Sequence, residues 1–478
     1  MECQDLRQEA TRQRRCDGWW KSARTSQGGE RLGRVIPWRL AIFGLCLSLV
    51  VAGCRQASQP VAPSPSPLEE LGRLPGLRRS THPQLSEELA RIEEEGGTPE
   101  QLTVPLPPRE DNAASALVAL FPKERVEFLV AQTSDWLRVA PDRLQKEELQ
   151  AAKSLLQSFQ TQRATCRAAL LRPKCVFPIR FTAGFGADLS FVDQCVLAVQ
   201  IEHLAAALAI SEGNLDAAVD ALNVALRLCG VLSRTKHPLL RWQAASLRRQ
   251  TLDCLPTLVS HPEITRDALG QIADTLQKEL AIWPSDAETW IGARALGMHA
   301  YELVRIGRLY DVLTEREIKQ LRQSYDLEEL VRTTQEHADQ DEFYYLTQMR
   351  EIIKHSQKPY CERAGELEKL QAAWEHKSHD DETVVACRVL LPEVPTGQKT
   401  QAEDLANVCA WLVALRAARE DIQSWDTVNP LTGRPFIVEV QDDTVYVSGI
   451  GTDIGLHGAI GVPRRPPPKG SQPKREQT

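Results

Sequence analysis

The chain has 478 residues, a formal net charge of −7 at pH 7 and a pI near 5.9. Its Lys and Arg residues form no basic stripe outside the N-terminal leader and the C-terminal tail, so we expect no nucleic-acid partner. The length is enough for two or three ordinary domains or for one long helical array.

An apolar stretch at residues 35–53 contains a single charge, Arg39, and follows a segment rich in arginine. A basic region before an apolar stretch is typical of an export signal. Its uninterrupted apolar part is about 14 residues long, whereas a span of the bilayer needs about 20. The stretch ends Val51-Ala52-Gly53-Cys54, which resembles the lipobox of bacterial lipoproteins. This resemblance implies that Cys54 is lipidated and becomes the new N-terminus.

Two alternatives to lipidation remain open for this stretch, an uncleaved membrane anchor and a buried core helix. Positive charge before the apolar part keeps the N-terminus inside the cell, which places the rest of the chain outside the cytoplasm. An anchor of several acyl chains holds a protein firmly where a single chain does not. We therefore expect a lipid-anchored protein of the cell membrane or outer membrane that faces the periplasm or the exterior.

Composition divides the chain into five parts. Residues 58–67 are rich in proline and serine and carry no charge, which is typical of an extended spacer. A short helix is predicted further along, at residues 85–95. The expected parts are a signal or anchor segment (1–53), a Pro-rich flexible stalk (54–111), a helical domain (112–400), a C-terminal unit of one helix and a β-hairpin (401–462), and a disordered tail (463–478).

The central part of the chain is dominated by helix-forming residues at a spacing of 3.6. The clearest pattern is a pair of amphipathic helices joined at Glu212-Gly213-Asn214, with small residues such as Ala218 on the facing sides. This pair resembles one helical hairpin of the tetratricopeptide type. Because no 34-residue repeat follows it, we predict a mainly α fold with an irregular, solenoid-like helical domain. Further helices are predicted at 142–165, 239–255, 263–282, 286–308, 315–323, 327–354, 363–377 and 404–420.

Two β-rich runs near the C-terminus, residues 435–440 and 444–448, predict a hairpin that rests on the preceding helix. The order of features around Asn429, Gly433 and Asp453 resembles the C-terminal end of type II secretion pseudopilins. Together with the anchor and the helical body, it resembles a group of uncharacterised envelope proteins of planctomycete-type bacteria. That resemblance implies no activity.

Eight cysteines follow Cys54. Outside the cytoplasm an even number of cysteines permits disulfides, and we expect one or two, with Cys166 and Cys175 as the most local pair. Free buried thiols are the alternative interpretation. No CxxC pair is present, so zinc-ribbon and thioredoxin-like chemistry lack their usual signature.

Sequence motifs for metalloproteases, P-loops, nucleophile elbows and dinucleotide binding are absent. The densest group of polar residues contains His376, His379, Asp380 and Asp381, which we interpret as a solvated face, and we expect no metal and no cofactor. His203 is expected in the core. The leading hypothesis is a non-enzymatic, membrane-tethered extracytoplasmic scaffold that binds as yet unidentified proteins. The alternative is an envelope hydrolase with a site of dispersed acids and histidines.

Overall fold

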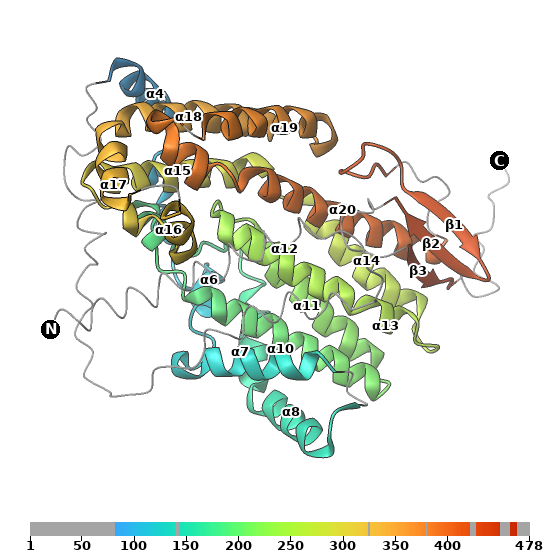
Figure 1. The fold of residues 1–478 in the computed structure, drawn as a ribbon. Coiled ribbons are helices and arrows are strands. Elements are labelled where there is room, and N and C mark those ends of the chain that lie inside the picture. Colours follow the sequence, from blue (N-terminus) through green and yellow to red (C-terminus); the bar gives the residue numbers. More distant parts are fainter. Residues whose placement is uncertain are drawn as a thin grey trace.

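The structure is a computed structural model that describes residues 82–139, 143–323, 326–378, 380–420, 427–449 and 459–465. Helices form most of this chain, and a three-stranded antiparallel sheet lies near its C-terminal end (Figure 1). The prediction of a mainly α fold with a small C-terminal β-hairpin is therefore confirmed. The expected signal segment, the lipidation candidate Cys54 and the tail after residue 465 lie outside the described residues.

The segment before the helical body differs from the expected spacer, because its helices at residues 83–94 and 99–102 pack onto the body. Helix α4 (Pro83–Glu94) buries Leu85 and Ile92 completely within the apolar cluster that α15 and α18 also form. The carboxylate of Glu88 accepts a 2.6 Å hydrogen bond from Nη1 of Arg350. The short helix predicted in this segment thus exists, and its apolar face is covered by the body.

Two helices occupy the region where a single one was predicted at residues 142–165. The break falls at Phe159, whose backbone (φ −103°, ψ 17°) leaves the helical region. Its buried ring packs edge-on against Phe121, with ring centroids 5.1 Å apart. A side chain held by tertiary contacts therefore interrupts a segment with good helical periodicity. The helices between α4 and the end of this region are α5 (Pro99–Leu102), α6 (Ala114–Leu117), α7 (Lys123–Leu137), α8 (Lys146–Ser158) and α9 (Gln160–Ala169).

A packed loop connects α9 and α10, as the prolines and glycines of this segment predict. It contains the short 3-10 helix η3 (Phe181–Gly186), in which Gly184 adopts φ 53°. A Cβ atom at Gly184 would lie 2.1 Å from Nδ1 of His299. Glycine is therefore required here both by the backbone conformation and by the close approach of α15.

The predicted helical hairpin is formed by α10 (Phe191–Ser211) and α11 (Leu215–Ser233). Gly213 takes φ 73° in the turn, and the side chain of Asn214 caps α11 by accepting a hydrogen bond from the backbone N–H of Ala217. Ala218 has no exposed surface, as expected for a small residue between close helices. Within the described residues α10 is the one helix long and apolar enough to cross a membrane, and most of it is buried inside the body.

The second half of the body continues as helices, of which the first (residues 238–253) lies against α11 (Figure 1). A single helix was predicted at residues 327–354, but the chain turns at His337 (φ −100°, ψ 9°) so that the following helix can pack on α15. The elements are α12 (Pro238–Asp253), α13 (Leu255–Val259), α14 (Arg266–Ala281), α15 (Asp286–Arg305), η4 (Leu309–Asp311), α16 (Glu315–Leu321), α17 (Leu327–Glu336), α18 (Ala338–His355), α19 (Tyr360–Lys377), η5 (Asp381–Thr383), the π-helical turn η6 (Ala386–Leu390) and α20 (Val394–Ala418).

The C-terminal sheet consists of β1 (Ile437–Gln441), β2 (Thr444–Ser448) and β3 (Ile460–Pro463), in that spatial order. Asp442 and Asp443 both take positive φ in the two-residue turn between β1 and β2, the geometry that suits the twist of a hairpin. The register pairs Val440 with Val445. The third strand was not predicted from the sequence.

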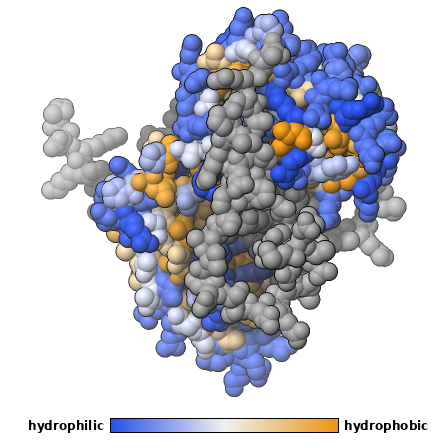
Figure 2. Space-filling model, turned by 90° about the vertical axis from the view of Figure 1, so that its left-hand side faces the viewer, coloured by the Kyte–Doolittle hydropathy of each residue, from blue (hydrophilic) through white to orange (hydrophobic). Residues whose placement is uncertain are grey.

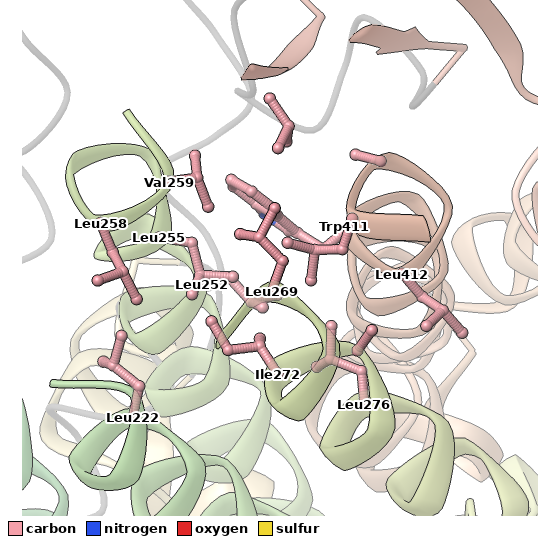
Figure 3. Close-up of a cluster of buried hydrophobic side chains, with 14 of the residues drawn as sticks. Leu222, Leu252, Leu255, Leu258, Val259, Leu269, Ile272, Leu276, Trp411 and Leu412 are labelled. Atoms are coloured by element: carbon pink, nitrogen blue, oxygen red, sulfur yellow. The ribbon is translucent and has the colours of Figure 1, made fainter. Parts of the chain in front are cut away.

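The sheet rests on α20, as the apolar residues of that helix predicted. Val445 and Val447 of β2 are buried in one cluster with side chains of α13, α14 and α20. Figure 3 shows Trp411 reaching from α20 toward Val259 and Leu269 in this cluster. The cluster gives the hairpin the apolar support that a two-stranded ribbon lacks in water.

The described surface carries scattered apolar side chains. On the face shown in Figure 2, hydrophobic patches are small and lie between hydrophilic residues. Leu171, with 76% of its surface exposed, and Phe128, with 62%, are the most exposed of the large apolar residues. Single exposed apolar residues are ordinary, whereas several close together indicate a contact surface.

Candidate functional site

The densest polar chemistry of the described chain lies inside the body, along α20. Four polar residues at every third position of this helix are buried, and their exposed fractions do not exceed 5%. At 3.6 residues per turn, a spacing of three makes this polar stripe wind slowly around the helix. It can therefore meet several neighbouring helices in succession. The four residues are Gln398, Gln401, Asp404 and Asn407.

The amides of the stripe bind neighbouring helices. Gln401 accepts a 3.0 Å hydrogen bond from the indole N–H of Trp290 and donates one of 2.9 Å to Oγ1 of Thr289. Gln398 donates to Oγ of Ser356 at the end of α18. These bonds fix α20 against α15 and α18, which is a structural role.

The ion pair between Arg248 of α12 and Asp404 of α20 is the central contact of the network. Nη1 of Arg248 donates to Oδ2 of Asp404, and both side chains are almost fully buried. Burial is the largest single influence on the pKa of Arg248 and lowers it, but the charge and hydrogen bond of Asp404, together with Cys229 and Glu279, raise the pKa overall. The guanidinium of Arg248 therefore stays charged in the folded protein.

A second arginine of α12, Arg241, lies seven residues before Arg248 and hence on the same side of the helix. Both guanidinium groups lie over the ring of Trp283, with Cζ 4.9 Å and 4.5 Å from its centroid. Nη2 of Arg241 is 3.7 Å from Oδ1 of Asp286 at the start of α15. Burial lowers the pKa of Arg241. Trp283 thus contacts two buried cations.

Arg363 of α19 completes the network. It is paired with Asp286 at 2.5 Å and also donates to the backbone carbonyls of Ser356 and Lys358, at 2.8 and 3.1 Å. The arginine–aspartate network, defined as Arg241, Arg248, Arg363, Asp286 and Asp404, joins α12, α15, α19 and α20. Its residues are spread over more than 160 positions of the sequence, from 241 to 404.

A separate buried group of acids lies between α15 and α18, in the acidic stretch of residues 336–345. Asp341 accepts hydrogen bonds from the hydroxyl of Tyr301 and from the backbone N–H groups of Val385 and Ala386, at 2.7 to 2.9 Å. Burial raises the pKa of Asp341 to about 6. The carboxylate holds the turn before η6 in place.

Glu342, the next residue, pairs with Arg305, which also binds Asp339. Burial raises the pKa of Glu342 to about 7, although the charge of Arg305 opposes the shift. In the structure these acids bind an arginine and backbone N–H groups. Such pairing is typical of helix-joining contacts.

The histidine and aspartate group of residues 375–382 does not form a metal site in the part that the structure describes. Asp380 accepts a 3.1 Å hydrogen bond from the backbone N–H of Glu382, and His379 lies outside the described residues. Among the described residues no group of three or more His, Cys, Asp or Glu could hold a metal ion. His203 lies in the core, where its Nε2 is 2.8 Å from Oγ1 of Thr251 and burial lowers its pKa to about 4.

The expected disulfide between Cys166 and Cys175 is not formed in this structure, in which all eight cysteines after Cys54 are free thiols. Cys166 is buried on α9, and burial raises its pKa to about 12. Burial likewise raises the pKa of Cys175 to about 11. Thiols of this kind are weak nucleophiles, because the reactive thiolate form is disfavoured.

Asn429 organises the loop in which the pseudopilin resemblance lies. Its Oδ1 accepts a 2.9 Å hydrogen bond from the backbone N–H of Leu431, and its Nδ2 donates to the carbonyl of Gly449 at the end of β2. Its backbone N–H donates to the carbonyl of Arg434 at 2.8 Å. The fully buried amide therefore ties the loop to the sheet, while Asp453 lies outside the described residues.

The fold and its interior define a mainly α protein with a docked three-stranded sheet and an internal ion-pair network. Comparisons with protein-family models, with curated proteins and with solved structures give no match to this chain. Any function must therefore be argued from these residues themselves.

Proposed function

We propose that this protein is a membrane-tethered, extracytoplasmic scaffold that binds other proteins, and that the free edge of its C-terminal sheet is the contact surface. The tether rests on the lipobox-like sequence ending at Cys54. The proposal includes no enzymatic role, because the buried carboxylates of Asp341, Glu342 and Asp404 already bind arginines or backbone N–H groups.

The observation that carries the proposal is the exposure of β1. The sheet order is β1-β2-β3, so β1 has a ladder partner on one side, and within the described residues nothing pairs with its other side along Ile437–Gln441. The chain is bridged only just before the strand, where Val428 pairs with Pro435. An unpaired edge offers a row of N–H and C=O groups to another strand.

The exposed side chains around this edge favour the binding of a partner strand. Ile437 and Val440 expose 55% and 54% of their surfaces, and Tyr446 of the neighbouring strand exposes 36%. Natural edges are usually guarded by charged side chains, lysine above all, or by proline; β1 contains no lysine or proline, and Glu439 is its one charge. Addition of an extended segment to such an edge is a recurring mode of protein recognition, in which alternate side chains give specificity. The proposed partner therefore contributes an extended, largely apolar strand.

A lysine at the edge tests the proposal. Val440→Lys places a charge where a partner strand would pack, and because Val440 is already exposed the fold should be retained. Leu171→Lys is the matched control, since Leu171 is an exposed apolar residue on the turn after α9. Proteins that co-purify from envelope extracts with the parent and with Leu171→Lys should be lost from Val440→Lys. An identical set of proteins with all three would contradict the role of β1.

A further inference from the structure

Several buried hydrogen-bond donors around Trp283 have no partner among the described residues. A guanidinium group carries five N–H donors and no acceptor. Among the described residues, Nε and Nη2 of Arg241, Nε and Nη2 of Arg248, and Nε1 of Trp283 have no hydrogen-bond partner. All five atoms are shielded from solvent. Buried polar atoms of this kind are rare in folded proteins, and an ion or a water is the usual explanation.

The unpartnered donors lie close together. Each guanidinium carbon is within 5 Å of the centre of the same indole ring. The two arginines come from one side of α12, and Trp283 comes from the loop between α14 and α15. Three side chains from two segments thus bring their unsatisfied N–H groups together around one indole ring.

The same region has an excess of positive charge. The arginine–aspartate network contains three arginines and two aspartates, of which Asp286 is shared by Arg241 and Arg363, so the network carries a net charge of +1. Glu279 also acts on Arg248 through its charge, but Glu279 lies 3.8 Å from Arg234, a cation outside the network. An unneutralised buried charge is strongly destabilising.

We propose that a chloride-sized monovalent anion binds beside Trp283 and accepts hydrogen bonds from the unpartnered N–H groups of Arg241 and Arg248. One negative charge balances the network, and a spherical acceptor can take several donors from different directions. A water molecule would provide acceptor capacity but no charge. The anion is a structural ligand that stabilises the junction of α12 with α20, and the site is independent of the edge of β1.

Anomalous scattering from bromide locates such an anion directly. Crystals of the protein grown in sodium bromide should show an anomalous peak within about 3.5 Å of Nε or Nη2 of Arg241 or Arg248, the reach of a hydrogen bond to a halide. An ordered water at this place without anomalous signal would overturn the proposal.

Thermal unfolding of the full chain provides the second measurement. At constant ionic strength, the melting temperature should rise with chloride in place of gluconate and should reach a plateau. Arg241→Met should abolish the plateau, whereas Arg332→Met, which removes an exposed cation of α17, should retain it. If Arg241→Met does not fold, Arg241→Lys should shift half-saturation to several-fold higher chloride. A bromide peak in crystals without any chloride effect in solution would mean an adventitious ion only, and this too would overturn the proposal.

Discussion

Arg248 and Asp404, 156 residues apart in the sequence, form an ion pair that is almost fully shielded from water between α12 and α20. Two buried charges of opposite sign stabilise a fold only while both are present. The pair therefore holds α12 against α20, the helix that carries the sheet. It gives the most direct test of how the interior is organised.

We expect Asp404→Ala to lower the free energy of unfolding by about 3–5 kcal/mol, because it leaves the guanidinium of Arg248 without its partner. The double variant Arg248→Met/Asp404→Leu should recover much of this loss, since apolar side chains can replace a buried pair. Urea denaturation measures both. As a control, Glu329→Ala removes a partner from the exposed pair with Arg332 and should cost less than about 1 kcal/mol. Equal losses at the two sites would show that the Arg248 pair is solvated.

Ala218 tests the close approach of α10 and α11. Because its side chain is fully buried, Ala218→Leu should overpack the helix contact and cost about 1–3 kcal/mol of stability. Ala217→Leu is the matched control, since Ala217 is the exposed neighbour on the same helix, and its effect should stay within about 0.5 kcal/mol. Similar melting temperatures for the two variants would contradict the packing of the hairpin.

The pH dependence of stability should reveal Glu342. Burial raises its folded-state pKa to about 7, above its ordinary value of 4.5, so between these values the folded state binds a proton that the unfolded state has released. The contribution of Glu342 is therefore full below about pH 4.5 and is lost as the pH rises through 7.

Glu342→Gln should flatten the fall in stability between pH 5 and pH 7.5, measured by urea unfolding at both values. Arg305 keeps Asp339 as a partner in this variant, so the fold should be retained. Glu329→Gln, an exposed acid of α17, serves as the control and should leave the slope unchanged. The same slope in the parent and in Glu342→Gln would mean that Glu342 has an ordinary pKa.

The tether depends on Cys54. If this cysteine is lipidated, Cys54→Ser should abolish labelling by a radioactive or clickable fatty acid and should prevent processing to the shorter mature form. Cys46→Ser, a change inside the apolar stretch, should leave labelling intact. Labelling that persists in Cys54→Ser would leave the uncleaved anchor as the explanation.

Local patterns in the sequence predicted the parts of the fold that depend on neighbouring residues. The hairpin of α10 and α11 follows from apolar spacing and from the turn at Gly213, and the first two strands follow from β-branched runs around two aspartates. The docking of the sheet followed from the apolar face of α20, on which Trp411 lies. The residues that determine each of these elements lie close together in the sequence.

The remaining features depend on contacts between distant segments. The strand β3 is four residues long and includes Gly461 and Pro463, so its β-propensity is weak without β2 beside it. The sequence predicts a spacer at residues 82–111 because the apolar face of α4 is short. This face is buried by packing against α18, which is far away in the sequence. The pairing of Arg248 with Asp404 left no clear local signal, because residues 398–407 (QKTQAEDLAN) mix charged, polar and small side chains. The sequence therefore does not show which of these polar side chains are buried or which residue Asp404 pairs with.

Site-specific photo-cross-linking at the edge of the sheet tests the proposed scaffold most directly. A benzophenone side chain at Val440 in the full-length protein, illuminated in intact cells, should form a discrete adduct with another protein, and the adduct should disappear when Ile437→Lys is introduced as well. The same probe at Leu171 should give no such adduct. Equal cross-linking at both positions, or none at Val440, would contradict the account of β1 as the binding edge.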